Sequence, residues 1–203
     1  MRTLVIDSAT EACSVALFDG SQLIAGAYEI LGRGHAERLV PMIAELPDRG
    51  RAPRIAVSLG PGSFTGVRIG LAAARALGFA WSADVLGYPT LALVAAMARQ
   101  EGPGPVTVCM TGGHGEWFVQ GFDANGLPEH PWASLTPDAA AAAPAHSLCA
   151  GSQAEALVGA RGGAGRALQM LPDAREWLLL PPALLTAAPA PIYGRAPDAR
   201  RPA

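Results

Sequence analysis

A glycine-rich loop holds the residues of this chain that are best suited to binding a ligand or a partner. Residues 58–70 read SLGPGSFTGVRIG, between a short apolar run and a long apolar stretch. At the start of a helix such a loop can hold an anion, because its backbone N–H groups and the helix dipole point at one spot. The same loop can instead set the entry angle of a helix that docks on a partner. Choosing between these two roles decides the class of the protein.

The composition excludes several kinds of chemistry at this loop. All 15 basic residues are arginine, so the chain lacks the lysine of a Walker phosphate loop and of lysine-based catalysis. The candidate nucleophiles Ser63 and Thr65 have no evident His and Asp partners in the sequence. The histidines show no metal-ligand spacing, and we expect surface or loop positions for His35, His114, His130 and His146. We therefore predict no catalytic residue and no metal site.

A second candidate phosphate site is the turn at residues 7–10, which reads DSAT. A turn with Asp, Gly and a hydroxyl can grip a phosphate, since glycine lets the backbone approach it. Here Ala9 replaces that glycine, and Glu11 adds a repelling charge. We favour a hairpin whose Asp and Thr side chains bond their own backbone. The weak candidates for cofactor contacts are Asp7, Thr10, Gly62 and Ser63.

The apolar stretch after the loop predicts a helix from about residue 65 to residue 83. After Gly66, its only polar residues before Ser82 are Arg68 and Arg75, which share one face. A helix that is apolar nearly all round requires burial on both sides. One side should cover its own sheet, and the other should meet a partner. A stripe of small residues suits close approach of a second helix: Gly66, Gly70, Ala74 and Gly78.

A neighbouring helix, residues 36–46, also has an apolar face, since its apolar residues recur at i, i+3, i+4 and i+7. Two adjacent helices with surplus apolar faces indicate a subunit interface. The predicted contacts are Leu39, Met42, Ile43, Gly66, Arg68, Gly70, Ala74, Arg75 and Gly78. Gly70→Leu or Ala74→Leu should then abolish partner binding and leave the chain folded. The alternative, that the second domain covers this face, stays open.

The wider pattern predicts the elements that position these residues. Three short strands in a meander precede alternating helices and parallel strands, in the order β-β-β-α-β-α-β-α, followed by a smaller α/β unit. This order is typical of the actin, Hsp70 and sugar-kinase class. The clearest break is the run EGPGP at residues 101–105. We predict an N-terminal domain at 1–101, a smaller C-terminal domain at 102–190 and a tail at 191–203.

Three stretches of the first half form a recognisable set: residues 6–17 (IDSATEACSVAL), 35–43 (HAERLVPMI) and 60–70 (GPGSFTGVRIG). Together they closely resemble the bacterial TsaB (YeaZ) family, within a match that covers about residues 3–100. Near the end, residues 191–195 (PIYGR) look like the family's Pro-x-Tyr-x-Arg. Residues 111–114 (TGGH) depart from the acidic and basic residues that the family places before a Gly-Glu pair.

The resemblance implies an actin-like ATPase (ASKHA, ribonuclease H-like) α/β fold with two subdomains, the second shortened, and no catalytic site of its own. It implies pairing with the catalytic paralogue TsaD, which transfers a threonylcarbamoyl group to A37 of tRNAs that read ANN codons. The ATPase TsaE joins them, and tRNA is met only through the complex. No cofactor of its own is implied, and an adenine nucleotide at the heterodimer boundary is left open. Alone, the chain could form a homodimer.

Two other functions stay open. A small-molecule kinase of the actin-like class would need a glycine in the first turn and a paired carboxylate in the second domain. A peptidase, a label once attached to relatives of this family, would need a metal site or a triad.

Three widely spaced cysteines without a C-x-x-C motif indicate a reduced, cytoplasmic protein. No apolar stretch has the length and continuity of a membrane span, so we expect no membrane contact.

Overall fold

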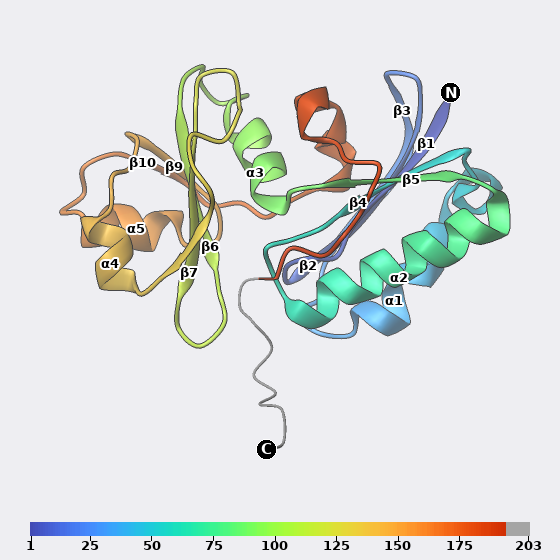
Figure 1. The fold of residues 1–203 in the computed structure, drawn as a ribbon, viewed down its shortest axis with the longest axis horizontal. Coiled ribbons are helices and arrows are strands. Elements are labelled where there is room, and N and C mark those ends of the chain that lie inside the picture. Colours follow the sequence, from blue (N-terminus) through green and yellow to red (C-terminus); the bar gives the residue numbers. More distant parts are fainter. Residues whose placement is uncertain (194–203) are drawn as a thin grey trace.

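The computed structural model describes residues 1–193, which form two five-stranded sheets (Figure 1). The first sheet has the order β3-β2-β1-β4-β5. Its strands are β1 Arg2–Asp7, β2 Ala12–Asp19, β3 Gln22–Ile30, β4 Arg54–Ser58 and β5 Asp84–Tyr88. The first three are antiparallel, and β4 and β5 run parallel to β1. Parallel pairing requires crossover connections, which here run through helices.

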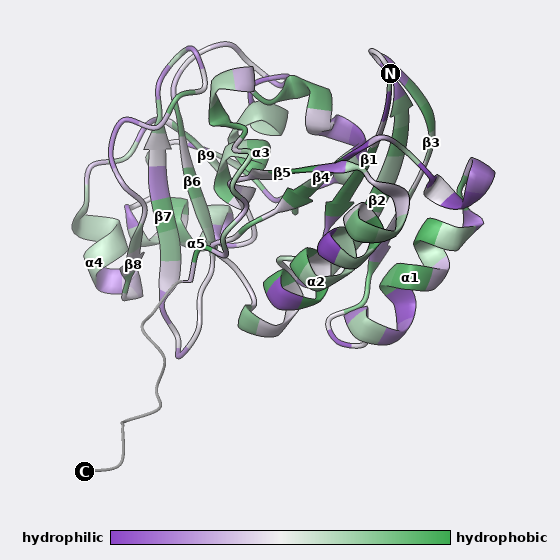
Figure 2. Ribbon diagram, turned by 45° about the vertical axis from the view of Figure 1, so that its right-hand side comes forward, coloured by the Kyte–Doolittle hydropathy of each residue, from purple (hydrophilic) through white to green (hydrophobic). Residues whose placement is uncertain are grey.

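Helices α1 (His35–Glu45) and α2 (Phe64–Trp81) cover one face of the first sheet, with the short 3-10 helix η1 (Pro47–Gly50) after α1 (Figures 1 and 2). Side chains on a strand alternate between faces. Leu4 and Ile6 therefore pack in the core beneath these helices, whereas Val5 packs in the core on the opposite face. Helix α3 (Thr90–Ala98) lies on that opposite face, between the two sheets, and nearly all of its residues are buried.

The second sheet has the order β10-β9-β6-β7-β8. Its strands are β6 Val106–Thr111, β7 Trp117–Phe122, β8 Ala133–Leu135, β9 Leu148–Ala150 and β10 Arg166–Leu168. Helices α4 (Pro137–Ala142) and α5 (Ala154–Ala160) pack against it. Strands β8 to β10 have three residues each, so only the β6–β7 hairpin spans the sheet at length.

After β10 the chain returns to the first sheet through the 3-10 helices η2 (Ala174–Leu179) and η3 (Pro182–Leu184). Thr186 forms a β-bridge with Gly87, and the Ile192 N–H donates to the Leu59 carbonyl at 2.7 Å. We call residues 186–193 the strap. The domain boundaries at 101 and 190 stay predictions, and residues 194–203 of the predicted tail lie outside the described residues. Within the described part, no helix is long and apolar enough to cross a membrane.

Candidate docking face and glycine loop

The glycine loop is held by its own chain. The Gly60 N–H donates to Thr90 Oγ1 at 3.0 Å, the Ser63 N–H to the Ala9 carbonyl at 2.7 Å and the Gly66 N–H to Ser63 Oγ at 3.2 Å. Gly60 has a φ of 92°, which favours glycine. These N–H groups already have partners, so they do not stand ready for an anion. Ser63 is the N-cap residue of α2.

The carboxyl of Asp7 is fully buried at the end of β1. Its Oδ1 accepts from the Ala9 N–H at 3.1 Å, and the Tyr88 hydroxyl lies 3.1 Å from its Oδ2. Burial raises the pKa of Asp7 to about 6, and these hydrogen bonds oppose the rise. Thr10 Oγ1 accepts from the Ala12 N–H at 3.2 Å. Asp7 and Thr10 thus accept hydrogen bonds from nearby backbone N–H groups, as we expected for a hairpin turn.

The stripe of small residues faces inward. A Cβ at Gly70 would lie 2.5 Å from Ser8 Oγ, and one at Gly78 would lie 2.5 Å from Val85. Gly66 packs on the backbone of Ser8, and Ala74 is fully buried in the core under α2. The prediction that this stripe admits a partner's helix is wrong, because the chain's own sheet already occupies the space.

The predicted contacts on α1 are wrong for the same reason. Leu39 and Met42 are fully buried and Ile43 is nearly so, all three in the core between α1 and the sheet. Their helical spacing correctly predicts an apolar face, but that face is covered from within the molecule. His35, which we expected on the surface or in a loop, is also buried, with its Nε2 3.3 Å from the Ala12 carbonyl.

The outer sides of α1 and α2 carry a different apolar surface, which the sequence analysis missed. Phe79 is 92% exposed, Val40 56% and Phe64 47%. We call this surface the docking face: Ala36, Val40 and Ala44 on α1 with Phe64, Arg68, Ala72, Arg75, Ala76 and Phe79 on α2. Figure 2 shows α2 coloured hydrophobic over most of its length. Of the nine predicted contacts, only Arg68 and Arg75 belong to it. Val40 and Phe79 could have revealed this surface from the sequence, because their helical positions do not coincide with those of the buried apolar residues.

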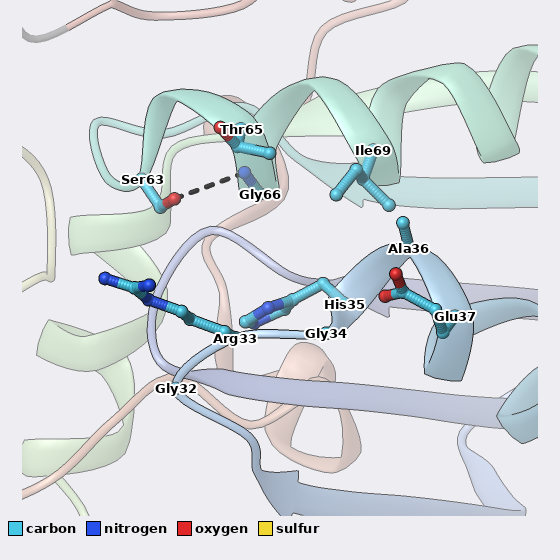
Figure 3. Close-up of a pocket in the computed structure, with 10 residues that line it drawn as sticks. All are labelled: Gly32, Arg33, Gly34, His35, Ala36, Glu37, Ser63, Thr65, Gly66 and Ile69. Atoms are coloured by element: carbon cyan, nitrogen blue, oxygen red, sulfur yellow. Dashed lines mark hydrogen bonds between the residues drawn. The ribbon is translucent and has the colours of Figure 1, made fainter.

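A hollow of about 470 Å³ separates the first turns of the two helices (Figure 3). It is lined by residues 32–37 and by the start of α2, including Thr65 and Ile69. Its polar groups carry both signs of charge, from Arg33 and Glu37. In Figure 3 the Arg33 side chain extends away from α1. The hollow therefore presents no concentrated charge and is a recess at the edge of the docking face.

Comparison with known proteins shows which family this chain is related to. A family model described as TsaD, tRNA N6-adenosine threonylcarbamoyltransferase, matches residues 29–126. The crystal structure of a Pseudomonas aeruginosa protein described as similar to peptidase YeaZ is 31% identical, with a TM-score of 0.73 over 87% of this chain and 88% of that one. The chain belongs to the TsaB/YeaZ family. A second structure, YeaZ from Pseudomonas aeruginosa, is 29% identical with a TM-score of 0.71 over the same shares.

Curated relatives agree with the family resemblance. The protein of Escherichia coli named tRNA threonylcarbamoyladenosine biosynthesis protein TsaB is 36% identical over 135 residues, 63% of this chain. The Bacillus subtilis protein of the same name is 38% identical over 90 residues, 42% of this chain. The matched regions span 58% and 38% of those relatives' own lengths. The predicted TsaB/YeaZ membership and the predicted actin-like fold are confirmed.

Proposed function

We propose that this TsaB/YeaZ-family chain is an accessory subunit for formation of the threonylcarbamoyl group on A37 of tRNAs that read ANN codons. In this proposal it acts by pairing with the catalytic paralogue TsaD. Two relatives are named tRNA threonylcarbamoyladenosine biosynthesis protein TsaB, and these names support a role in making this tRNA modification. The match of residues 29–126 to the TsaD family model supports a paralogous relation to the enzyme.

The observation that carries the pairing is the docking face. Exposed aromatic and branched side chains on two adjacent helices favour association, because burying them releases water from apolar surface. Phe79 and Val40 lie on outer helix sides that no other element of the described residues covers, and Phe64 is about half exposed beside Tyr193 of the strap. Arg68 and Arg75 add positive charge at the edge of the face, which favours a partner with acidic residues opposite them. Aromatic and arginine side chains are the usual energetic centres of such interfaces.

In the proposal the chain supplies no chemistry of its own. A kinase of this class would need Asp7 to face a phosphate, but Tyr88 and the first turn enclose its carboxyl. A peptidase would need a metal or a nucleophile, and no cluster of metal-binding side chains occurs among residues 1–193. No arrangement of the described residues favours either alternative, although the description of one relative carries the word peptidase.

The remaining parts of the proposal concern the assembly. TsaE joins the pair, and tRNA is met only through the complex. If an adenine nucleotide binds, it does so at the heterodimer boundary, not on the chain alone. Without TsaD, the docking face pairs with a second copy of the chain. We place the assembly in the cytoplasm, in keeping with three cysteines that are free and buried.

Reconstitution tests the proposal. We expect TsaD, TsaE, threonylcarbamoyl-AMP and an ANN-decoding tRNA to give modified A37 only when this chain is added. Modification at the full rate without the chain would overturn the accessory role. Calorimetry of the lone chain with Mg-ATP is the second arm, because a kinase should bind the nucleotide at micromolar to millimolar level. We expect no heat of binding.

A further inference from the structure

The strap lies along the arginine side of α2, where it meets the docking face. Arg75 Nη2 donates to the Pro189 carbonyl at 2.8 Å. About two turns toward the start of the helix, Arg68 Nε donates to the Tyr193 hydroxyl at 3.1 Å. Both arginines of α2 are therefore held by a segment more than 100 residues away in sequence.

Three side chains form a stack at the end of the strap. The Arg68 guanidinium carbon lies 3.6 Å from the Phe64 ring centroid and 5.3 Å from the Tyr193 ring centroid. The two ring centroids are 5.1 Å apart. These distances lie within the ranges for cation–π and aromatic-pair attraction. Phe64 is thus about half exposed and yet held on one side by two partners.

The strap itself is fixed immediately before Tyr193. The Ile192 N–H donates to the Leu59 carbonyl at 2.7 Å, and Ile192 packs at the edge of the core under α2. A Cβ at Gly60 would lie 2.6 Å from the Ile192 carbonyl, so the glycine leaves room for the strap. Because the backbone is anchored at Ile192, the next side chain is brought to Arg68 at little conformational cost.

An ordered aromatic side chain is a better anchor than a mobile one. Binding must otherwise fix the rotamers of each side chain that it buries, and that cost reduces affinity. Arg68 bonds to Tyr193 and covers one side of the Phe64 ring, so losing Tyr193 frees both side chains. Tyr193 acts on Phe64 both directly, through the ring contact, and through Arg68.

We infer that Tyr193 is a positioning residue of the docking face, which holds Arg68 and Phe64 in the arrangement that TsaD meets. The inference rests on the proposed function for the identity of the partner. The tyrosine contributes to TsaD binding through Phe64, and this distinguishes it from an ordinary contact residue.

The first test needs no partner. The Arg68 side-chain N–H should give a resolved NMR signal that exchanges slowly with water in the wild-type chain. Tyr193→Phe keeps the ring but removes the acceptor oxygen, so exchange should become faster. If the wild-type signal exchanges as fast as that of Tyr193→Phe, the stack does not hold Arg68 and the inference is overturned.

The second test is a double-mutant cycle on TsaD binding. We expect Tyr193→Ala to weaken binding by about fivefold to tenfold, the size of effect expected when an anchor loses its order. In a Phe64→Ala background the same change should have almost no further effect. In a Phe79→Ala background, with the matched aromatic at the far end of α2, it should keep its full effect. Independent, additive effects of Tyr193→Ala and Phe64→Ala would overturn the inference.

The controls separate this inference from the proposed function. Wild-type chain that fails to bind TsaD would contradict the proposed function, while the NMR experiment would still decide whether Tyr193 holds Arg68. Thermal unfolding shows whether the variants remain folded. If Tyr193→Ala unfolds, Tyr193→Leu replaces it, since leucine keeps apolar bulk without a ring or a hydroxyl. Tyr193→Phe should retain most of the affinity, because the ring contact with Phe64 survives.

Discussion

The two long sides of helix α2 have similar apolar composition and opposite surroundings. The inner side carries Gly66, Gly70 and Gly78, which let the helix lie close against β1, β4 and β5. The outer side carries Ala72, Ala76 and Phe79, which face solvent. Small residues on the inner side are thus explained by the chain's own packing. The apolar residues on the outer side have no such internal explanation, and this is why we propose partner binding there.

The largest expected effect is on the inner side. Gly70→Leu should unfold the chain or lower its stability by about 3 kcal/mol or more, because a Cβ there meets Ser8 at 2.5 Å and further atoms overfill the core. Thermal unfolding measures the change. This reverses the expectation from sequence that the variant would stay folded. The matched control on the outer side is Ala72→Leu, which should change stability by about 0.5 kcal/mol or less. A folded Gly70→Leu chain that loses only TsaD binding would restore the glycine stripe as the interface.

The next effect concerns the buried carboxyl of Asp7, at the end of β1. The pKa of Asp7 in the folded chain is raised from 3.8 to about 6, so the fold favours the protonated form. Its contribution to stability is therefore most favourable below pH 4 and is lost as the pH rises through about 6. A shift of this size corresponds to about 3 kcal/mol.

Denaturant unfolding between pH 4 and pH 8 measures this loss. Asp7→Asn cannot ionise, so the wild-type chain should lose stability relative to the variant as the pH rises. Other groups titrate alike in both proteins and cancel in this difference. A difference that stays constant across the range would show that Asp7 is not enclosed as described.

A smaller effect is expected on the outer side. Phe79→Ala should weaken TsaD binding by about tenfold, since truncation of an exposed aromatic anchor costs about 1–2 kcal/mol. It should leave the free energy of unfolding almost unchanged, because the side chain is 92% exposed. Titration calorimetry gives the affinity, and thermal unfolding provides the control. Equal affinity of the variant and the wild type would remove Phe79 from the interface.

The sequence predicted the elements well because each depends on local patterns. Alternation and turn residues predicted the three-stranded meander, and the apolar stretch after the glycine loop predicted α2. The helical spacing of Leu39, Met42 and Ile43 located the apolar face of α1. Such local patterns indicate which residues share one face of a helix or strand.

Local patterns do not state what covers that face. The inward orientation of Gly70 depends on Ser8, and the enclosure of Asp7 depends on Tyr88, which is 81 positions away. The stack on Phe64 depends on Tyr193, which is 125 positions from Arg68. Contacts over such separations are set by how the two sheets and the returning strap assemble, and no short motif records them. The two helices were therefore predicted where the structure has them, while seven of the nine contacts predicted on them lie in the chain's own core.

We propose that the outer sides of α1 and α2 bind TsaD. The most direct measurement is titration of TsaD with the wild-type chain and with a Val40→Asp, Phe79→Asp double variant, which places one charge on each helix. Both positions are exposed, so the variant should keep the wild-type unfolding temperature. We expect saturable binding by the wild-type chain and no detectable binding by the folded variant. Equal binding by the two proteins would show that this face does not bind TsaD.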